Sequence, residues 1–562
     1  MTARITPAMV ALGRTITEPK LAPDGATVAF VSTTGGRNSL VTVDVYGGPE
    51  RVIAIDPEPA TRGGVFDWCR GGVALVYAGR AGGLWCVPAS GGRAGEVSDI
   101  TAEGITASPD GTRVAAVVDQ RDVVVVDLES GVPAVVRGEQ NTFAFDPIWS
   151  DEELRWQEWT EPDMPWDASR VVGWTPERGR VVRFERPRSQ AQQPRGDAVL
   201  CDANGWLNVW SLSEQRPLVD EPYEHGGPSW GMGQRSFAWS PDGARLAFAR
   251  NELGFGRLCV VDVASRAVEE VAKGVHQSLS WEDGYLVAVR SGGRTPNQLV
   301  AYDTGTWKRT VLAHGPVAGF EGALAEPEPV TWSGDDGTVL YGRFYRASGR
   351  SVVVWIHGGP TDQWDVRFLP RIAYFVELGW SVFVPDHRGS TGHGRAFTQA
   401  LTGRWGELDI GDTIAGVRSL GAFDHVVAMG GSAGGFTTLG LLAAHNDVVT
   451  AGVVVYPVTD PVALGGVTHR FERHYTERLA APSELRPDLD TVRGPLLVLH
   501  GADDVVVPAS MTRAYVERLC ARGAHVEYHE YEGEGHGWRR PETVADELAR
   551  ATAFLTGLWS RS

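Results

Sequence analysis

Turn signals recur at a nearly constant spacing through the first half of this chain. The turns are centred on Asp24, Arg70, Asp110, Asp151, Asp197, Asp242 and Asp283. Successive turns are 46, 40, 41, 46, 45 and 41 residues apart, and each precedes an alternating or β-branched run typical of a strand. A four-stranded propeller blade takes about 40–50 residues. Seven units in register therefore predict a seven-bladed β-propeller over residues 16–318, in preference to a sandwich with regular turns.

The rest of the chain predicts a second domain of a different class. A length of 562 residues is more than one core usually supports. Proline, glycine and glutamate interrupt the chain between residues 315 and 328, and short apolar strands and helical segments follow. We expect a doubly wound α/β domain over residues 319–562. We also expect residues 1–15 to form a helix that packs on this second domain.

A glycine-rich run, Gly430–Gly435, separates an apolar strand at Val426–Met429 from an apolar helix at Phe436–Ala444. Ser432 lies at its centre. A sharp strand-to-helix turn lifts a serine hydroxyl above a sheet only where the flanking residues carry almost no side chain. In a chain with 69 glycines, the pattern G-x-S-x-G also arises by chance, so the run alone is a weak signal. Ser432 is the candidate nucleophile.

An acid and a base follow this serine in the order that α/β-hydrolases use: serine, aspartate, histidine. The loop after an apolar strand carries Asp503 and Asp504, of which Asp504 is the candidate acid. A later strand leads into the glycine-flanked His536, the candidate base. His525 and His529 fall within that strand pattern and are interpreted as solvated residues. The three parts in order predict an α/β-hydrolase fold for the second domain.

Backbone amides that stabilise an oxyanion can also be named. One is the amide of Ala433, which directly follows the candidate nucleophile. The other is expected in the loop after an earlier strand, where we assign Gly359, with Gly358 as the alternative. Removing one such donor has cost other enzymes about 10²–10³ in rate. His357, which precedes these glycines, is interpreted as support for the loop.

Six segments together resemble the prolyl oligopeptidase family of serine peptidases. They are HGGP at 357–360, RGSTGHG at 388–394, RWGELDIGD at 404–412, GGSAGGF at 430–436, HGADDVVVP at 500–508 and EGEGHG at 532–537. Segments 149–167 and 468–475 resemble the branch of acylaminoacyl-peptidase-like and puromycin-hydrolase-like enzymes. The resemblance implies a propeller ahead of an α/β-hydrolase. The chain departs from that branch at Glu161 and Asp163, where relatives tend to carry His and Asn.

Substrate contacts are predicted in both domains. The candidates are Tyr456, Val458, Val507 and Trp538 beside the serine, and the acids Glu161, Asp163, Glu221 and Glu224 for a substrate amine. The apolar candidates fit a core role equally well, and the acids also fit solvated surface positions. Family motifs elsewhere suggest structural roles: Arg388 is expected to pair with an acid such as Asp386, and Asp409 and Asp412 lie on the first turns of a helix.

Charge and composition limit the partners. A net charge of −18 argues against nucleic acid and anionic membranes, because a phosphate binder needs excess Lys and Arg. No run of about 20 apolar residues and no signal peptide is evident, so a cytoplasmic location is expected. The five widely spaced cysteines are expected to be reduced core residues, and neither metal nor cofactor is expected. The sequence does not indicate an oligomeric state.

Three functions stay open at this point. The first is a serine peptidase that cleaves short peptides or aminoacyl and N-acylaminoacyl amides, with the propeller limiting substrate size. The second is an amidase or esterase acting on a small aminoacylated metabolite or antibiotic. The third is an inactive propeller scaffold that binds a partner, which is disfavoured because an unused serine gives no reason to keep strained glycine turns.

Overall fold

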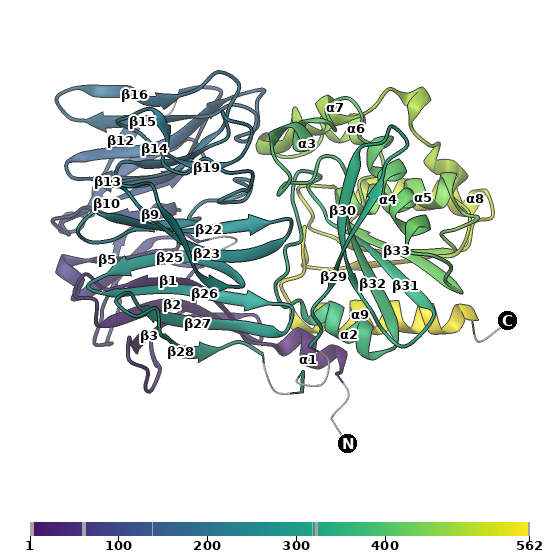
Figure 1. Ribbon diagram of the computed structural model, residues 1–562, viewed down its shortest axis with the longest axis horizontal. Helices are drawn as coiled ribbons and strands as arrows, with labels where there is room; N and C mark the ends of the chain where they lie inside the picture. The colour runs from purple at the N-terminus through teal and green to yellow at the C-terminus, as the bar shows by residue number, and fades with distance from the viewer. Residues whose placement is uncertain (1–4, 59–62, 138, 317–318, 321–323, 560–562) are drawn as a thin grey trace. The chain divides into compact units, whose positions relative to one another are not determined.

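The computed structural model describes residues 5–58, 63–137, 139–316, 319–320 and 324–559 (Figure 1). The chain divides into two compact units. The propeller unit is Arg14–Pro316 with Asp365–Arg367, and the hydrolase unit is Met1–Gly13, Val317–Trp364 and Phe368–Ser562. The predicted propeller end at residue 318, and residues 1–4 of the predicted N-terminal segment, lie outside the described residues.

The propeller unit contains seven four-stranded antiparallel sheets, each built from consecutive strands (Figure 1). Blade 1 is β1 Thr15–Leu21, β2 Thr27–Thr34, β3 Arg37–Asp44 and β4 Arg51–Ile55; blade 2 is β5 Phe66–Cys69, β6 Ala74–Ala78, β7 Leu84–Pro88 and β8 Gly95–Ser98. Blade 3 is β9 Glu103–Ala107, β10 Arg113–Val118, β11 Asp122–Asp127 and β12 Pro133–Arg137. Blade 4 is β13 Thr142–Ser150, β14 Glu153–Thr160, β15 Arg170–Thr175 and β16 Gly179–Glu185.

The last three blades repeat this order. Blade 5 is β17 Ala191–Arg195, β18 Ala198–Cys201, β19 Asn208–Ser211 and β20 Arg216–Pro217; blade 6 is β21 Phe237–Trp239, β22 Arg245–Glu252, β23 Phe255–Asp262 and β24 Val268–Lys273. Blade 7 is β25 Val275–Glu282, β26 Tyr285–Gly292, β27 Thr295–Asp303 and β28 Arg309–His314. All seven predicted turns lie between the first and second strands of a blade. The prediction of a seven-bladed propeller is confirmed.

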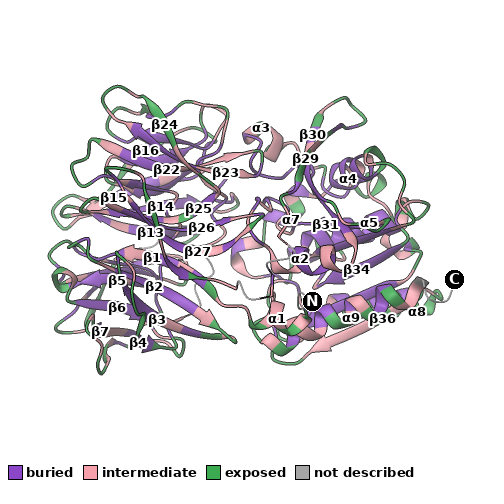
Figure 2. Ribbon diagram, turned by 60° about the horizontal axis from the view of Figure 1, so that its bottom comes forward, coloured by how far each residue is buried: buried purple, intermediate pink, exposed green. Residues whose placement is uncertain are grey.

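The ring closes by packing, because blades 1 and 7 share no strand among the described residues. Strand β1 packs beside β25 and β26. Ile16 and Phe30 of blade 1 lie in one buried cluster with Val287 and Leu299 of blade 7. Figure 2 shows this burial running along the strands of the blades. Apolar contact therefore replaces the backbone hydrogen bonds that a shared strand would supply.

The segment between β20 and β21 runs across the ring; we call residues 228–236 the hub segment. A Cβ added to Gly63 of blade 2 would lie 2.6 Å from the carbonyl oxygen of Gly233, and one added to Gly104 of blade 3 would lie 2.9 Å from the sulfur of Met232. The amide of Gly233 donates to Asp146 Oδ1 of blade 4 at 2.5 Å. Only glycine allows backbones to approach this closely.

Arg235 extends the hub segment to two more blades. Its guanidinium donates to the carbonyl oxygens of Pro19 in blade 1 at 2.5 Å and Leu279 in blade 7 at 3.3 Å. The Glu18 carboxylate lies 3.8 Å from Arg235 Nη1, and Glu18 also accepts from the Gly64 amide at 2.7 Å. The hub segment thus touches blades 1, 2, 3, 4 and 7, so it passes through the centre of the ring.

The hydrolase unit is built on one eight-stranded sheet with the order β29-β30-β32-β31-β33-β34-β35-β36. Its strands are β29 Glu328–Ser333, β30 Val339–Tyr345, β31 Ser351–Ile356, β32 Trp380–Asp386, β33 His425–Gly431, β34 Ala451–Val455, β35 Leu496–Gly501 and β36 Val526–Tyr531. The pairs β29–β30 and β30–β32 are antiparallel, and every other pair is parallel. The predicted α/β-hydrolase fold is confirmed.

Helices cover both faces of this sheet. The α-helices are α1 Pro7–Leu12, α2 Pro370–Glu377, α3 Arg395–Gln399, α4 Leu408–Ser419, α5 Ala433–Ala444, α6 Pro461–Leu464, α7 Tyr475–Leu479, α8 Ala509–Ala521 and α9 Pro541–Trp559. Short 3₁₀ turns are η1 Arg70–Gly72 in the propeller unit, and η2 Arg470–Glu472, η3 Ser483–Leu485 and η4 Leu489–Thr491 here. Helices α2 and α9 pack on one face and α4, α5 and α8 on the other. Helix α1 packs against α9.

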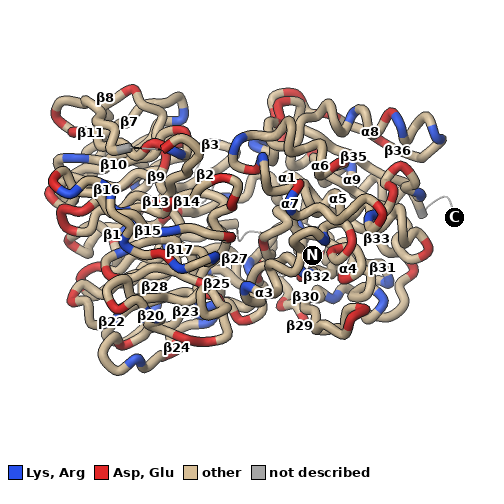
Figure 3. The backbone as a smooth tube through the Cα atoms, turned by 90° about the horizontal axis from the view of Figure 1, so that it is seen from above, with Lys and Arg blue, Asp and Glu red and all other residues tan. Residues whose placement is uncertain are grey.

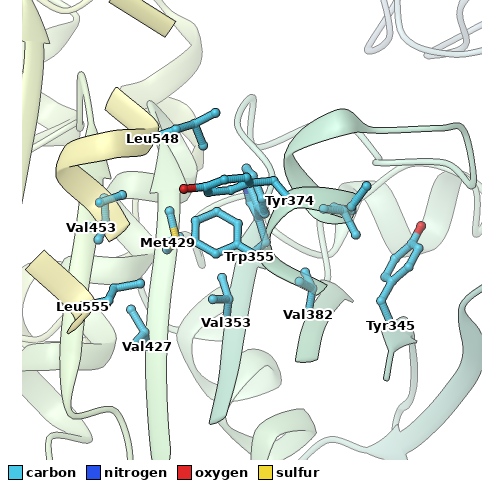
Figure 4. Close-up of a cluster of buried hydrophobic side chains, with 14 of the residues drawn as sticks. Tyr345, Val353, Trp355, Tyr374, Val382, Val427, Met429, Val453, Leu548 and Leu555 are labelled. Atoms are coloured by element: carbon cyan, nitrogen blue, oxygen red, sulfur yellow. The ribbon is translucent and has the colours of Figure 1, made fainter. Parts of the chain in front are cut away.

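The two faces are separated by strict alternation along the central strands. Val353 and Trp355 of β31 point into the cluster with α2 and α9, of which Figure 4 shows a part. Val352 and Val354 point into the opposite cluster. A continuous apolar run is what a parallel strand buried on both faces requires. The sheet is therefore a rigid base for the loops at its carboxyl edge.

Two structural expectations need correction. Arg388 pairs with acids, as expected, but not with Asp386: its guanidinium binds Asp412 at 2.6 Å and Asp336 at 2.5 Å, while Asp386 binds Arg343. Arg388 follows the end of β32, and the first turns of α4 bring Asp412 to it, which no local spacing reveals. Cys520 is exposed and not a core residue, because it lies near the end of α8.

Charged residues of both signs are spread over each unit (Figure 3). In the part of the chain that the structure describes, no helix is long and apolar enough to span a bilayer.

Candidate active site

Ser432 occupies a strained turn between β33 and α5. Its φ of 53° and ψ of −121° fall outside the ordinary regions for a residue with a side chain. A Cβ added to Gly434 would lie 2.5 Å from the carbonyl oxygen of Ile356, so α5 begins in direct contact with the end of β31. The glycines around Ser432 thus allow the close approach that a nucleophile elbow needs.

Asp504 and His536 form a hydrogen-bonded pair beyond β35 and β36. His536 Nδ1 donates to Asp504 Oδ2 at 2.7 Å. With the Nδ1 proton directed at the carboxylate, Nε2 carries the lone pair of the neutral ring. The His536 side chain is 20% exposed and that of Asp504 is fully buried. Asp503, the alternative acid, is exposed.

Both oxygens of the Asp504 carboxylate accept hydrogen bonds. Oδ1 accepts from the amides of Val506 and Val507, each at 2.9 Å. Oδ2 lies 3.4 Å from His500 Nε2 in addition to its bond with His536. Burial alone would raise the pKa of Asp504, but the hydrogen bonds from His500 and His536 outweigh it and hold that pKa below its usual range. The Asp504 carboxylate is therefore ionised when the His536 imidazole acts as a base.

The loop after β31 lies beside the serine. A Cβ added to Gly358 would lie 3.6 Å from the Ser432 Cβ. His357 Nδ1 donates to the Gly358 carbonyl at 2.8 Å, and Ser390 Oγ donates to His357 Nε2 at 2.7 Å. In a trans peptide the N–H points opposite to the C=O. Fixing the Gly358 carbonyl therefore also fixes the direction of the Gly359 amide.

His357 holds this loop as a neutral ring. Burial, with His387 as a lesser cause, lowers the pKa of His357 to about 3. Two hydrogen bonds, one donated and one accepted, match the neutral tautomer. Ala433 begins α5 and is buried beside the same loop.

The predicted apolar contacts divide into two kinds. The Tyr456 ring lies 4.4 Å from the His536 ring, and Trp538 lies 5.3 Å from Tyr456. Val458 and Val507 are buried, and their amides bind the Ser432 carbonyl at 3.2 Å and the Asp504 carboxylate at 2.9 Å. The aromatic rings line the site, whereas these two valines hold its backbone.

The predicted acids all lie in the propeller unit. Asp163 lines a cavity of about 530 Å³ in blade 4, with Glu158, Arg170, Glu185, Arg186 and Arg188 among its other walls. Glu224 is buried. Glu221 lies 2.8 Å from His225 Nε2 and 3.5 Å from Arg250, so internal partners compensate its charge. Glu161 precedes Pro162 in the loop after β14 and does not line that cavity.

Comparison with known proteins follows the same division of the chain. The profile of the prolyl oligopeptidase family matches residues 366–560. The hydrolase unit is a prolyl oligopeptidase-family domain. The predicted resemblance to the prolyl oligopeptidase family is confirmed over these residues.

Solved structures extend this likeness over both units. A puromycin-hydrolysing peptidase of Mycobacterium tuberculosis is 25% identical with a TM-score of 0.88, and the match covers 98% of this chain and 95% of that one. A puromycin hydrolase is 25% identical with a TM-score of 0.88, covering 99% and 96%. Each of these matches therefore includes both the propeller unit and the prolyl oligopeptidase-family domain.

Curated relatives match a shorter stretch. The acylamino-acid-releasing enzyme of Arabidopsis thaliana is 28% identical over 214 residues, or 34% of this chain and 28% of the relative. Dipeptidyl aminopeptidase BIII of Pseudoxanthomonas mexicana is 28% identical over 224 residues, or 36% of this chain and 32% of the relative. The chain thus covers less than a third of either relative's own length.

Three residues of the prolyl oligopeptidase-family domain that contact candidate site residues or their supports were not predicted. His500 contacts the Asp504 carboxylate, Ser390 anchors His357, and Glu547 accepts from the Trp538 indole. His500 and Ser390 lie inside the family motifs at 500–508 and 388–394, so the sequence does mark them. Glu547 lies in a long helix with no motif, and no sequence signal marks it.

Proposed function

We propose that this chain is a serine peptidase that hydrolyses short peptides or aminoacyl and N-acylaminoacyl amides through an acyl-enzyme at Ser432. The observation that carries the proposal is the Asp504–His536 pair at 2.7 Å, together with a serine of the same unit held at φ 53°. A strained serine, an oriented imidazole and a buried carboxylate are what nucleophilic acyl transfer requires.

The chemistry follows from these positions. Ser432 Oγ attacks the substrate carbonyl carbon while His536 Nε2 takes the hydroxyl proton, and Asp504 stabilises the imidazolium that forms. The amides of Gly359 and Ala433 bind the oxyanion. His536 then returns its proton to the leaving amine as the C–N bond breaks. Water repeats the sequence on the acyl-enzyme, and Ser432 is released.

Tyr456 and Trp538 are proposed as walls of the pocket for the acyl side chain, and Glu161, Asp163 and Glu224 as candidates for binding a substrate amine. Val458 and Val507 then act through the backbone of the serine and aspartate loops. The proposed role of the propeller is to restrict substrates to small ones, and the cytoplasmic location stays a prediction.

A second function keeps the same chemistry and changes the substrate. Two similar structures, each 25% identical over nearly the whole chain, are named for hydrolysis of puromycin. Puromycin is an aminoacylated small molecule, so this chain is also a candidate amidase or esterase for a metabolite or antibiotic of that class.

A fluorophosphonate probe tests both. Wild type should be labelled, Ser432→Ala should not, and Ser510→Ala, which removes an exposed serine of the same unit, should label as wild type does. Competition with aminoacyl anilides, N-acylaminoacyl anilides and puromycin then ranks the two substrate classes. A folded wild-type protein that resists the probe would contradict both functions and favour the inactive scaffold.

A further inference from the structure

A cluster of aromatic rings supports the candidate base. Tyr456 follows β34 and packs against the His536 ring with centroids 4.4 Å apart. The Trp538 ring meets Tyr456 edge-on at 5.3 Å and 74°. Tyr531, the last residue of β36, meets Trp538 edge-on at 5.1 Å and 71°. Edge-to-face contacts of this kind are favourable and fix the orientation of the rings.

His536 lies on a glycine-rich loop. Gly533 and Gly537 flank the histidine with φ of 72° and 110°, and Gly535 directly precedes it. The Glu534 carboxylate accepts from the amides of Arg539 and Arg540 and holds the backbone of this loop. The imidazole ring itself is contacted by the Asp504 carboxylate and by the Tyr456 ring.

Helix α9 anchors the cluster through an indole. Trp538 Nε1 donates to Glu547 Oε2 at 2.6 Å, and Glu547 is only 3% exposed. Arg371 of α2 donates to the other oxygen, Glu547 Oε1. A buried carboxylate that accepts from both a cation and an indole is held in one orientation. The neighbouring Asp546 accepts from the Tyr531 hydroxyl at 2.8 Å.

We propose that Glu547 and Arg371 are positioning residues for the candidate base, acting through Trp538 and Tyr456. The path runs from the Arg371–Glu547 ion pair to the indole N–H, from the indole to the Tyr456 ring, and from that ring to the imidazole. None of the four contacts involves Ser432. The inference rests on the proposed function, because a base has a position to keep only if the serine is activated.

The consequence differs from that of a binding residue. Loss of the anchor leaves the imidazole chemically intact but lets it move relative to Ser432. Small misplacements of reacting groups cost up to about 100-fold in rate. The loss should therefore fall on kcat, and on the rate of fluorophosphonate labelling, with little change in KM.

The decisive variant is Trp538→Phe, which keeps an aromatic ring and the Arg371–Glu547 pair but removes the N–H donor. We expect kcat and the rate of fluorophosphonate labelling to fall about 10-fold. Because Trp538 is also a proposed pocket wall, KM is compared in Glu547→Ala, where it should stay within about twofold of wild type. Glu547→Ala should fall further. Glu547→Gln keeps an oxygen that can accept from the indole, so it should recover most of the loss. Glu542→Ala, an exposed acid of the same helix, should match wild type.

The outcomes separate this inference from the proposed function. Wild-type kinetics in Trp538→Phe and Glu547→Ala, in an enzyme that labels at Ser432, would overturn the positioning role alone. So would a fall in activity that merely follows a fall in melting temperature across all variants, including Glu547→Gln. Absence of Ser432-dependent labelling in wild type would overturn the proposed function itself. If Glu547→Ala does not fold, Trp538→Phe decides.

Discussion

The hydrolase unit holds two histidine–aspartate pairs of equal length: His536 with Asp504, and His393 with Asp386, each at 2.7 Å. Both aspartates lie at the ends of sheet strands, Asp386 as the last residue of β32 and Asp504 just beyond β35. The surroundings of the pairs differ. The His536 side chain is 20% exposed and that of His393 is 1% exposed.

The buried pair has no route to a substrate. Arg343 and Gln363 also bind the Asp386 carboxylate, the latter at 2.8 Å, and Tyr341 stacks on the His393 ring at 4.5 Å and 8°. His393 Nδ1, the nitrogen away from Asp386, is buried and finds no hydrogen-bond partner among the described residues. Hydrogen-bond length therefore does not distinguish the candidate catalytic pair from the buried one. The exposure of the histidine side chain does.

The largest expected effect that tests this comparison is on catalysis. Asp504→Asn should lower kcat by about 10⁴-fold, because an amide cannot stabilise the imidazolium and favours the wrong tautomer. Folding should survive, since the Asn oxygen can still accept from Val506 and Val507. Steady-state kinetics with an aminoacyl anilide and a thermal melt measure both. Asp503→Asn is the control and should match wild type; equal loss in both variants would refute the assignment.

The second effect concerns stability. Asp386→Asn leaves the guanidinium of Arg343, which is 1% exposed, without its charge partner. Breaking a buried ion pair in this way costs about 3–5 kcal/mol in the free energy of unfolding. Urea unfolding measures it, with Asp424→Asn as the control, because the Arg350–Asp424 pair is exposed and worth about 1 kcal/mol or less. If Asp386→Asn lost activity but kept its full free energy of unfolding, Asp386 would act in catalysis, and the contrast with Asp504 would be wrong.

The smallest effect is on the pH dependence of unfolding. His357 is buried, and its pKa of about 3 lies below the usual value of about 6.5. Between these values the unfolded chain binds a proton that the folded chain does not. Stability is therefore lost as pH falls from about 6.5 towards 3, by about 1.4 kcal/mol per pH unit.

Replacing the imidazole tests that slope. His357→Gln should show a shallower loss between pH 6.5 and pH 5 than wild type, by about one proton, in urea unfolding series at fixed ionic strength. His314→Gln removes an exposed histidine and should leave the slope unchanged. An unchanged slope in His357→Gln would mean that this ring is not held neutral by burial.

Much of this molecule was predictable because its strongest signals are local. The seven blade turns, two of which read Ser-Pro-Asp-Gly (108–111 and 240–243), and the glycine elbow depend on neighbouring dihedral angles. The propeller, the hydrolase fold and the candidate Ser432 therefore follow from short segments. Arg388 shows the limit. Its motif indicates a structural role, but its partner Asp412 is chosen by the packing of α4 against the sheet.

The proposed positioning residues and the contacts of the hub segment could not be predicted either, because their partners are also set by packing and not by local sequence. Arg371 and Glu547 are 176 residues apart in sequence, and Gly233 meets Asp146 from 87 residues away. A glutamate in a helix and a glycine in a loop are common in any sequence. Their contacts form only when the sheet and the propeller ring are assembled, so the sequence alone does not reveal them.

The hub segment also bears on the order in which the chain can be built. In a linear repeat array each unit contacts only its neighbours and can finish as it is synthesised. Here Asp146 lacks the Gly233 amide, and Glu18 lacks Arg235, until the chain has been extended through blade 5. The first four blades therefore emerge from the ribosome with their inner charges only partly matched. Because the hub segment is synthesised after blade 5, we expect the propeller to complete its folding as a whole ring and not blade by blade.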